Sequence, residues 1–262
     1  MQHPTDPEGA EKLPPPAPDP AFGDIPAPAA GEGAVLIHGM GLKAQGVSMR
    51  PLAARLRRAG YQAVCIDYPA YRLTVEEALA ALRPRVRTAA LRMTRCHLVG
   101  HSLGGVLAVR LADAVPEARR GRVVQLGSPN LGSPLAALAG RVPTVRRVLG
   151  PVLEELAITQ DPDAVRAAKR GEQVGAVAGV TGWGAAAYVP RRFAPDLAAG
   201  FAEESDGKVA VSSALAIADE AAVLPVGHAF LPTSRRVADC VTRYLATGHF
   251  PDDVRVGLPR AC

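Results

Sequence analysis

Short apolar runs alternate with longer amphipathic segments along most of the chain. Mostly apolar runs predict buried strands at residues 34–37, 61–66, 96–99, 122–126, 174–180 and 222–226. Apolar residues at helical spacing predict helices at residues 49–59, 106–112 and 234–246, and a capping-box pattern predicts one that begins at residue 74. Strands that are apolar along their whole length and alternate with helices are typical of parallel sheets. The pattern therefore predicts an α/β fold whose mainly parallel sheet is covered by helices on both faces.

Two regions interrupt this alternation. Residues 1–30 contain nine prolines and few apolar residues, so they predict an extended or disordered N-terminal arm before a single domain at residues 31–262. Residues 128–172 contain no strand signal, and the helical segment 142–156 carries valines and leucines on more than one face. This predicts a helical cap or lid inserted at about residues 130–172, with an ordinary crossover helix as the alternative.

Length and composition fit one large domain and argue against a nucleic-acid partner. The chain has 262 residues, of which 48% are hydrophobic, and a single α/β domain commonly reaches this size. Its net charge of +5 comes from 26 arginines and 4 lysines against 25 acidic residues. These arginines are scattered along predicted helices without interleaved aromatic residues, so we expect no binding to nucleic acid.

Neither the cysteines nor the acidic residues have the spacing of a metal site. The four cysteines, at positions 65, 96, 240 and 262, form no C-x-x-C pair and are expected to be free thiols. No acidic cluster has the spacing of a calcium site. We therefore expect neither a metal nor a cofactor.

Targeting and membrane-spanning patterns bear on the cellular location of the protein. It shows no signal-peptide pattern and no apolar run of membrane-spanning length. This predicts a cytoplasmic location for the chain as written. A secreted protein whose signal has been removed is the alternative.

Residues 98–105 carry the strongest chemical signal. They read Leu-Val-Gly-His-Ser-Leu-Gly-Gly, so Ser102 stands between two glycines where an apolar run gives way to helical spacing. In a G-x-S-x-G turn of this kind the serine is held in a strained conformation that exposes its hydroxyl, and Gly100 and Gly104 keep neighbouring side chains away. The motif is short, but its position between a predicted strand and a predicted helix favours a nucleophile elbow.

The candidate base for Ser102 is a histidine late in the chain. On a sheet with a nucleophile elbow, the catalytic groups follow in the order Ser, Asp or Glu, His. Of the six histidines, only His228 and His249 follow Ser102. His228 comes just after the last predicted strand, at the sheet edge where ligand sites gather, so it is the predicted base. His249 follows the final predicted helix, where capping that helix is the simpler role.

The candidate acid is Asp206, one of thirteen carboxylates between Ser102 and His228. It lies in a Ser-Asp-Gly turn before a short run with β-branched residues, and such a turn can aim a carboxylate at a histidine on a nearby loop. A plain Asp-Gly turn is the alternative role. Asp196 and Asp219 are the other candidates for the acid.

Two backbone amides are candidates for an oxyanion hole, because the charge that develops on a reacting carbonyl needs preorganised N–H donors. The amide of Leu103, directly after the nucleophile, is one. The amide of Met40 is the other, since the His-Gly-Met-Gly loop after the first predicted strand can turn toward Ser102. His38 is expected to brace this loop through a hydrogen bond rather than to transfer a proton.

Together these motifs resemble those of the α/β-hydrolase superfamily, and within it the bacterial lipases and esterases with a His-Gly-x oxyanion loop. The resemblance runs from about residue 33 to residue 250 and is most specific at residues 37–40, 100–105, 126–134 and 206–209. It implies a catalytic triad and two oxyanion donors, namely Ser102, Asp206, His228, Met40 and Leu103. It also implies a cap after the Gly-Ser-Pro segment.

The resemblance further implies a sheet in which the strands carrying Cys65 and Cys96 flank the strand at residues 34–37. Two strand spacings of about 4.8 Å would then separate these cysteines, beyond the roughly 7 Å limit for a disulfide. This agrees with free thiols.

The resulting functional prediction is a cofactor-free serine ester hydrolase acting on a small-molecule ester or lipid. Leu149 and Leu153, in the predicted lid, are candidates for the wall of an acyl pocket, and the lid would contact a lipid interface transiently. A thioesterase or acyltransferase would use the same acyl-enzyme on Ser102 and is the alternative. A noncatalytic binding protein of the same fold is less favoured, because every triad residue type is present.

Overall fold

The computed structural model describes residues 26–40, 45–133, 136, 150–151, 169, 171–181 and 204–257. Within these ranges seven strands form one sheet in the order β2-β1-β3-β4-β5-β6-β7. The strands are β1 (Gly33–Ile37), β2 (Gln62–Ile66), β3 (Cys96–His101), β4 (Arg120–Leu126), β5 (Val174–Gly179), β6 (Glu220–Leu224) and β7 (Arg255–Val256). Strands β1 to β6 are parallel, and β7 runs antiparallel to β6. The predicted α/β fold with a mainly parallel sheet is confirmed.

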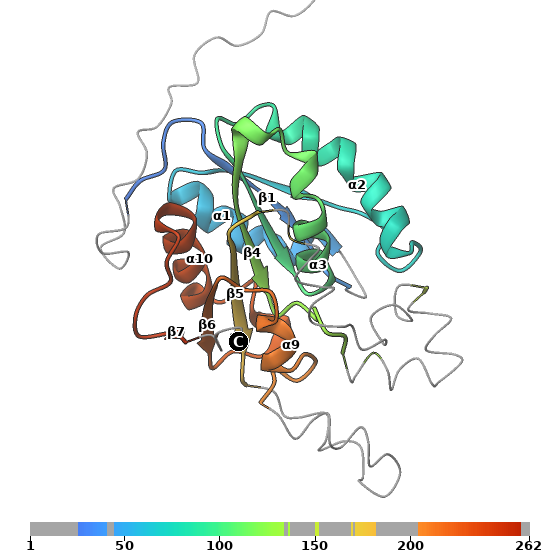
Figure 1. Cartoon of the computed structure of the whole chain (residues 1–262), viewed down its shortest axis with the longest axis vertical. Coiled ribbons are helices and arrows are strands. Elements are labelled where there is room, and N and C mark those ends of the chain that lie inside the picture. Colours follow the sequence, from blue (N-terminus) through green and yellow to red (C-terminus); the bar gives the residue numbers. More distant parts are fainter. Residues whose placement is uncertain are drawn as a thin grey trace, which may run out of the picture.

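Helices cover both faces of this sheet (Figure 1). The α-helices of the described ranges are α1 (Arg50–Arg58), α2 (Val75–Ala90), α3 (Leu103–Arg110), α9 (Val211–Leu215) and α10 (Arg235–Thr247). Helices α1 and α10 pack on one face, and α2 and α3 pack on the other (Figure 1). Short 3₁₀ segments are η2 (Gln45–Met49), η3 (Ala112–Ala114), η4 (Glu117–Arg119) and η6 (His228–Phe230).

Side chains along β1 alternate between the two apolar cores. Val35 and Ile37 belong to the core that includes α2 and α3, whereas Ala34 and Leu36 belong to the core that includes α1 and α10. Every residue of β1 is buried. A central strand covered on both faces must be apolar at each position, which is why apolar runs located the strands.

Local signals fix where two of the helices begin or end. Thr74 starts α2 with the predicted capping box: its Oγ1 accepts from the backbone N–H of Glu77 at 3.2 Å, and the Glu77 carboxylate accepts from the backbone N–H of Thr74 at 2.9 Å. At α10, Ser234 Oγ accepts from the backbone N–H of Val237, and Gly248 ends the helix in a left-handed conformation.

One α-helix and one strand were not predicted. Helix α9 has five residues that include two serines, too few for a helical pattern to emerge from the sequence. Strand β7 has two residues, and it pairs with β6 only through Val256 with Ala221 and Arg255 with Ala222. Both elements owe their conformation to contacts with the sheet, which are not visible in a short segment.

Three of the four cysteines lie in the described ranges, and they are free thiols as predicted. They are Cys65, Cys96 and Cys240. Cys65 on β2 and Cys96 on β3 are separated by β1, which is the strand order that the resemblance implied. Cys262 lies outside the described residues.

Several predictions concern residues outside the described ranges. These include residues 1–25 of the arm predicted at residues 1–30, most of the insertion at residues 130–172, and the pocket candidates Leu149 and Leu153. The arm, the lid and the pocket therefore remain predictions. None of the helices in the part of the chain that the structure describes has the length and apolar character needed to cross a membrane.

The strand order creates a switch point between β1 and β3. The chain passes from β1 to β2 on one side, and then crosses back so that β3 lies on the other side of β1. In open α/β sheets the connections leaving two such strands diverge, and a crevice forms outside their carboxyl ends. His38 follows β1 and Ser102 follows β3, so both residues lie at this point.

Candidate active site

Ser102 has a backbone conformation that is unusual for a residue with a side chain. Its φ and ψ are 54° and −126°, and it is the one non-glycine residue with positive φ in the described ranges. It lies between the last residue of β3 and the first residue of α3, and its N–H donates to the carbonyl of Leu126 on β4 at 2.9 Å. Such strain persists only where the surrounding structure imposes it, and it is common at functional sites.

The glycines around Ser102 allow the elbow to pack closely. A β-carbon at Gly100 would lie 2.2 Å from the carbonyl oxygen of Gly104, and one at Gly104 would lie 2.2 Å from the carbonyl oxygen of Ile37. Helix α3 therefore approaches β1 and β3 at distances that exclude side chains. This contact explains the glycines of the G-x-S-x-G motif.

Asp206 and His228 form a buried pair. Nδ1 of His228 lies 2.6 Å from Oδ2 of Asp206, and both side chains are almost inaccessible to solvent. The other carboxylate oxygen, Oδ1, accepts from the backbone N–H groups of Val209 at 2.8 Å and Lys208 at 3.0 Å. A carboxylate that only accepts requires Nδ1 to carry the hydrogen, which leaves Nε2 of His228 as the nitrogen that can take up a proton.

Two loops bring this pair together. Asp206 lies in a turn closed by a bridge between Ser205 and Ala210, and Gly207 in that turn has a φ of 97°. His228 starts η6 after strand β6, and its backbone N–H donates to the carbonyl of Asp206 at 2.9 Å. The predicted Ser-Asp-Gly turn thus binds both the ring and the backbone of the predicted base.

Gly127 lies between this pair and Ser102. It follows Leu126, whose carbonyl accepts from Ser102, and a β-carbon on it would lie 2.7 Å from Oδ2 of Asp206 and 3.2 Å from Nδ1 of His228. Ser102, Asp206 and His228 are therefore assembled around the carboxyl end of β4.

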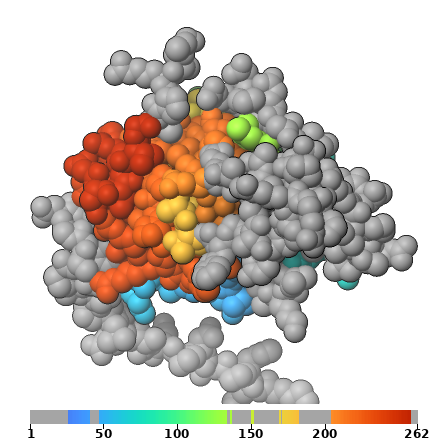
Figure 2. All heavy atoms as spheres, turned by 90° about the horizontal axis from the view of Figure 1, so that it is seen from below, coloured from blue at the N-terminus to red at the C-terminus, as the bar shows by residue number. Residues whose placement is uncertain are grey.

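Figure 2 shows the molecule from below relative to Figure 1. The segments from residue 204 onward, orange to red, form much of the coloured surface in this view.

The loop after β1 reaches Ser102. Gly39 lies against Ser102, since its added β-carbon would fall 2.7 Å from Cβ of Ser102. Met40 follows and is partly buried against the core that includes α2 and α3. Leu103 is the first residue of α3, where backbone N–H groups have no partner within the helix. The two predicted oxyanion donors therefore lie on segments that border Ser102.

His38 braces this loop, as predicted. Its Nδ1 donates to the carbonyl of Gly39 at 2.7 Å, and its Nε2 accepts from the N–H of Tyr68 at 3.2 Å. The rings of His38 and Tyr68 stack with centroids 4.5 Å apart. Burial lowers the pKa of His38, while the Gly39 carbonyl and the Asp67 carboxylate, 2.8 Å from Nε2, oppose this shift. Both ring nitrogens are engaged, so His38 is unsuited to take the proton of Ser102.

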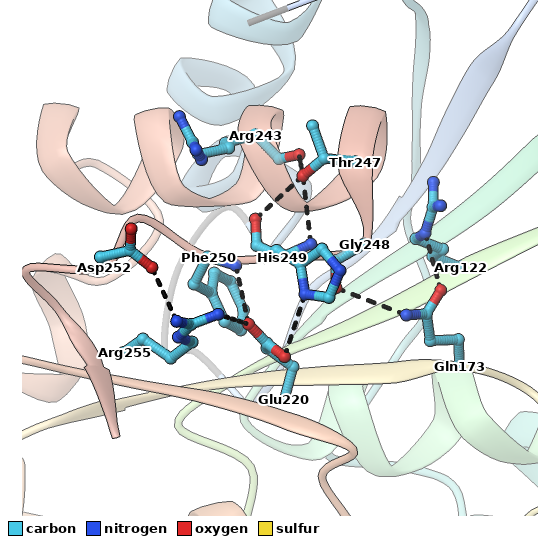
Figure 3. A network of polar contacts seen from close by, with 10 residues as sticks. All are labelled: Arg122, Gln173, Glu220, Arg243, Thr247, Gly248, His249, Phe250, Asp252 and Arg255. Atoms are coloured by element: carbon cyan, nitrogen blue, oxygen red, sulfur yellow. Dashed lines mark hydrogen bonds and ion pairs between the residues drawn. The ribbon is translucent and has the colours of Figure 1, made fainter. Parts of the chain in front are cut away.

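The other candidates for base and acid lie elsewhere. The His249 side chain is exposed and lies 3.4 Å from Glu220 in the network at the end of α10 (Figure 3). The cap of α10 is Gly248 rather than His249. Asp219 accepts from the N–H of Val174 at 2.8 Å, at the amino end of β5 and so at the opposite edge of the sheet from Ser102. Asp196 lies outside the described residues.

No sequence signal pointed to two contacts at this site. His101 lies between Gly100 and Ser102, and its Nε2 contacts the backbone of His228 at 3.0 Å. Asp67 contacts His38 from the end of β2. Chain order excluded His101 as a base, but no pattern in one sequence shows which backbone group a buried histidine binds. The described ranges contain no group of three or more side chains suited to hold a metal ion.

The chain is similar to known proteins in sequence pattern and in fold. Residues 34–256 match the family described as "Alpha/beta hydrolase family". Phospholipase PlaB from Legionella pneumophila is 18% identical with a TM-score of 0.51, and the match covers 70% of this chain and 44% of that one. Lipase BlEst2 from Bacillus licheniformis, in its propeptide form, is 21% identical with a TM-score of 0.52, covering 76% of this chain and 46% of that one.

A proposed thioesterase from Silicibacter is similar in fold as well. It is 19% identical with a TM-score of 0.52, and the match covers 85% of this chain and 78% of that one. The chain spans less than half the length of PlaB and of the propeptide form of BlEst2. No curated protein sequence matches it significantly. These similarities concern the fold.

Proposed function

The chain belongs to the α/β-hydrolase family, and we propose that it is a serine ester hydrolase that acts through an acyl-enzyme on Ser102. The observation that carries this proposal is the combination of a strained serine with a buried Asp206–His228 pair at one end of the sheet. A serine hydroxyl becomes a nucleophile when an oriented base takes its proton. The family alone allows many reactions, so the residues of the site carry the argument.

In the first half of the reaction, Nε2 of His228 takes the proton of Ser102 while Oγ attacks the ester carbonyl. The negative charge on the former carbonyl oxygen is stabilised by the N–H groups of Met40 and Leu103. Ser102 also stands at the N-terminus of α3, where the helix dipole favours negative charge. The attack forms a tetrahedral intermediate. When it collapses, His228 gives its proton to the departing alcohol, and the acyl group stays on Oγ of Ser102.

In the second half, His228 takes a proton from water, and the resulting hydroxide attacks the acyl carbonyl. The acid leaves, and Ser102 recovers its proton from His228. Asp206 keeps the ring of His228 in the tautomer with hydrogen on Nδ1 and stabilises the positive charge that the ring acquires. Its own charge is held by two backbone N–H groups.

The proposed substrates are small-molecule esters or lipids. The chain is similar in fold to a phospholipase and a lipase, which supports this class. Within it we propose that Leu149 and Leu153, in the insertion at about residues 130–172, contribute to the acyl pocket. We further propose that this insertion contacts a lipid interface.

The test combines labelling with a substrate panel. A fluorophosphonate should label Ser102, mapped by mass spectrometry, because only a serine with a base and oxyanion donors reacts quickly with it. Nitrophenyl esters from short to long acyl chains should be hydrolysed, and Ser102→Ala should abolish both labelling and hydrolysis. Labelling at Ser128 or Ser133, or hydrolysis of matched thioesters without hydrolysis of oxygen esters, would contradict the proposal.

A further inference from the structure

The His101 side chain is buried against the base. Its Nε2 lies 3.0 Å from the carbonyl oxygen of His228. A carbonyl oxygen only accepts, so Nε2 of His101 carries the hydrogen that it donates. The two imidazole rings lie beside each other, with centroids 4.8 Å apart and an interplanar angle of 44°. One side chain therefore connects the strand that precedes Ser102 to the loop that carries His228.

His101 keeps this hydrogen bond while the base changes its charge. Burial lowers the pKa of His101 well below the ordinary histidine value, and the nearby groups His228, Lys208 and His38 lower it further when they are positive. The bond to the His228 carbonyl raises the pKa, but by less than burial lowers it. His101 is therefore neutral, and it does not compete with His228 for the proton of Ser102.

The backbone of His228 is held at both ends of the residue. Its N–H donates to the carbonyl of Asp206 at 2.9 Å, and its carbonyl accepts from His101 at 3.0 Å. The first bond fixes the base relative to the acid. The second fixes it relative to the residue that precedes the nucleophile.

We infer that His101 is a positioning residue that sets the distance between Ser102 and His228. This inference rests on the proposed function, because the distance matters only if a proton passes between these two groups. A displacement of about 1 Å at a reacting centre can reduce turnover by roughly 100-fold, so one hydrogen bond that prevents such a shift has a large effect on rate. His101 acts through His228 and does not touch the reacting atoms.

Two variants separate positioning from the filling of space. His101→Gln offers an amide N–H near the position of the histidine Nε2, whereas His101→Leu fills the site without a donor. We expect His101→Leu to lower kcat roughly 10- to 100-fold with KM changed by less than about twofold, because binding of the ester does not depend on the base. The rate of fluorophosphonate labelling should fall in parallel. His101→Gln should restore kcat to within about fivefold of the wild type.

The outcomes are distinct. If His101 only filled space, both variants would lose the same factor in kcat, and that loss would follow the decrease in their thermal midpoints. Equal loss, or an unchanged kcat in His101→Leu, would overturn the inference. If either variant fails to fold, long-range ¹H–¹⁵N spectra of the wild-type histidines provide the test. His101 should then be neutral at pH 7 with hydrogen on Nε2, and an Nδ1–H or a charged ring at that pH would overturn the inference.

Failure of the proposed function would look different. Wild-type protein that neither reacts with fluorophosphonate at Ser102 nor hydrolyses esters would disprove the reaction itself. The tautomer of His101 would still report whether its bond to His228 exists. A labelled, active wild type with a His101→Leu variant of equal kcat would disprove the role of His101 alone.

Discussion

The backbone of Gly39 lies against the side chain of Ser102 without room for any further atom. A β-carbon at Gly39 would fall 2.7 Å from Cβ of Ser102 and 3.3 Å from its Oγ. It would also meet the carbonyl oxygen of His101 at 2.7 Å, closer than β-carbons come to other atoms in proteins. The loop after β1 therefore reaches Ser102 only because residue 39 is glycine.

We predict that Gly39→Ala disables the enzyme while leaving the fold intact. The new methyl group pushes the loop away from Ser102, and with it the N–H of Met40 that we propose for the oxyanion. Loss of one such donor reduces kcat by roughly 100- to 1,000-fold. The measurement is kcat on a short nitrophenyl ester, with circular dichroism to check folding. Gly257→Ala is the matched control, because no atom of the described residues lies within 4 Å of its added carbon. Full activity in Gly39→Ala would contradict this placement of the oxyanion hole.

His228→Ala should be about as damaging as Ser102→Ala. The two residues act as one unit, so either change removes the same transfer of a proton, and the double variant should lose little more than each single variant. The loss should reach several orders of magnitude in kcat. His249→Ala is the control, since its side chain is mostly exposed at the far end of α10. If His249→Ala were inactive and His228→Ala active, the base would be misassigned.

The sequence located most of the fold because burial on both faces leaves a strong pattern. Strand β1 is buried at every position, and its apolar run marked it within one residue. The capping signal also located the start of α2, for a different reason. It is local, because Thr74 and Glu77 form hydrogen bonds with each other within one turn. Strand β7 and helix α9 could not be found this way, because each is held by neighbours far away in sequence.

The candidate site was predictable where chemistry restricts the order of residues along the chain. The motif around Ser102 identified the candidate nucleophile, and chain order left two histidines as candidates for the base. The contacts of His101 and Gly127 could not be predicted, because they join loops that meet only after the sheet has formed. Both residues act on the geometry of other groups, and no residue type or spacing is specific for that role.

Asp206→Asn should fold and yet lose on the order of 10⁴-fold in kcat, as a serine protease does when its aspartate is changed in this way. The asparagine oxygen can still accept from the N–H groups of Val209 and Lys208. Its amide N–H then faces Nδ1 of His228 and forces the hydrogen onto Nε2, the nitrogen that must accept a proton. Asp219→Asn is the control at the opposite end of the sheet. Retained turnover in Asp206→Asn would show that another residue is the acid.

His97 gives the protein a predictable sensitivity to acid. The residue is fully buried, and its Nδ1 accepts from the backbone N–H of Arg122 at 2.9 Å. A second proton on the ring would set N–H against N–H at this contact. Burial lowers the pKa of His97 to about 3, and the positive charges of Arg122 and Arg95 add to the effect.

The folded protein should therefore lose stability as pH falls from about 6.5 toward 3. In this window the unfolded chain binds a proton at residue 97 and the folded chain does not, so this group lowers the free energy of unfolding by up to about 1.4 kcal/mol per pH unit. Above pH 6.5 neither state binds the proton and the effect vanishes. The variant His97→Asn keeps an acceptor for the Arg122 N–H but has no proton to gain. Between pH 7 and 4.5 its free energy of unfolding should therefore fall by about 2 kcal/mol less than that of the wild type.

Urea unfolding at the two pH values measures this difference. The control is Val99→Ala, a cavity-forming change on the same strand, which should lower the free energy of unfolding by the same amount at both pH values. Identical losses in the wild type and His97→Asn would mean that the folded state accommodates a charged His97.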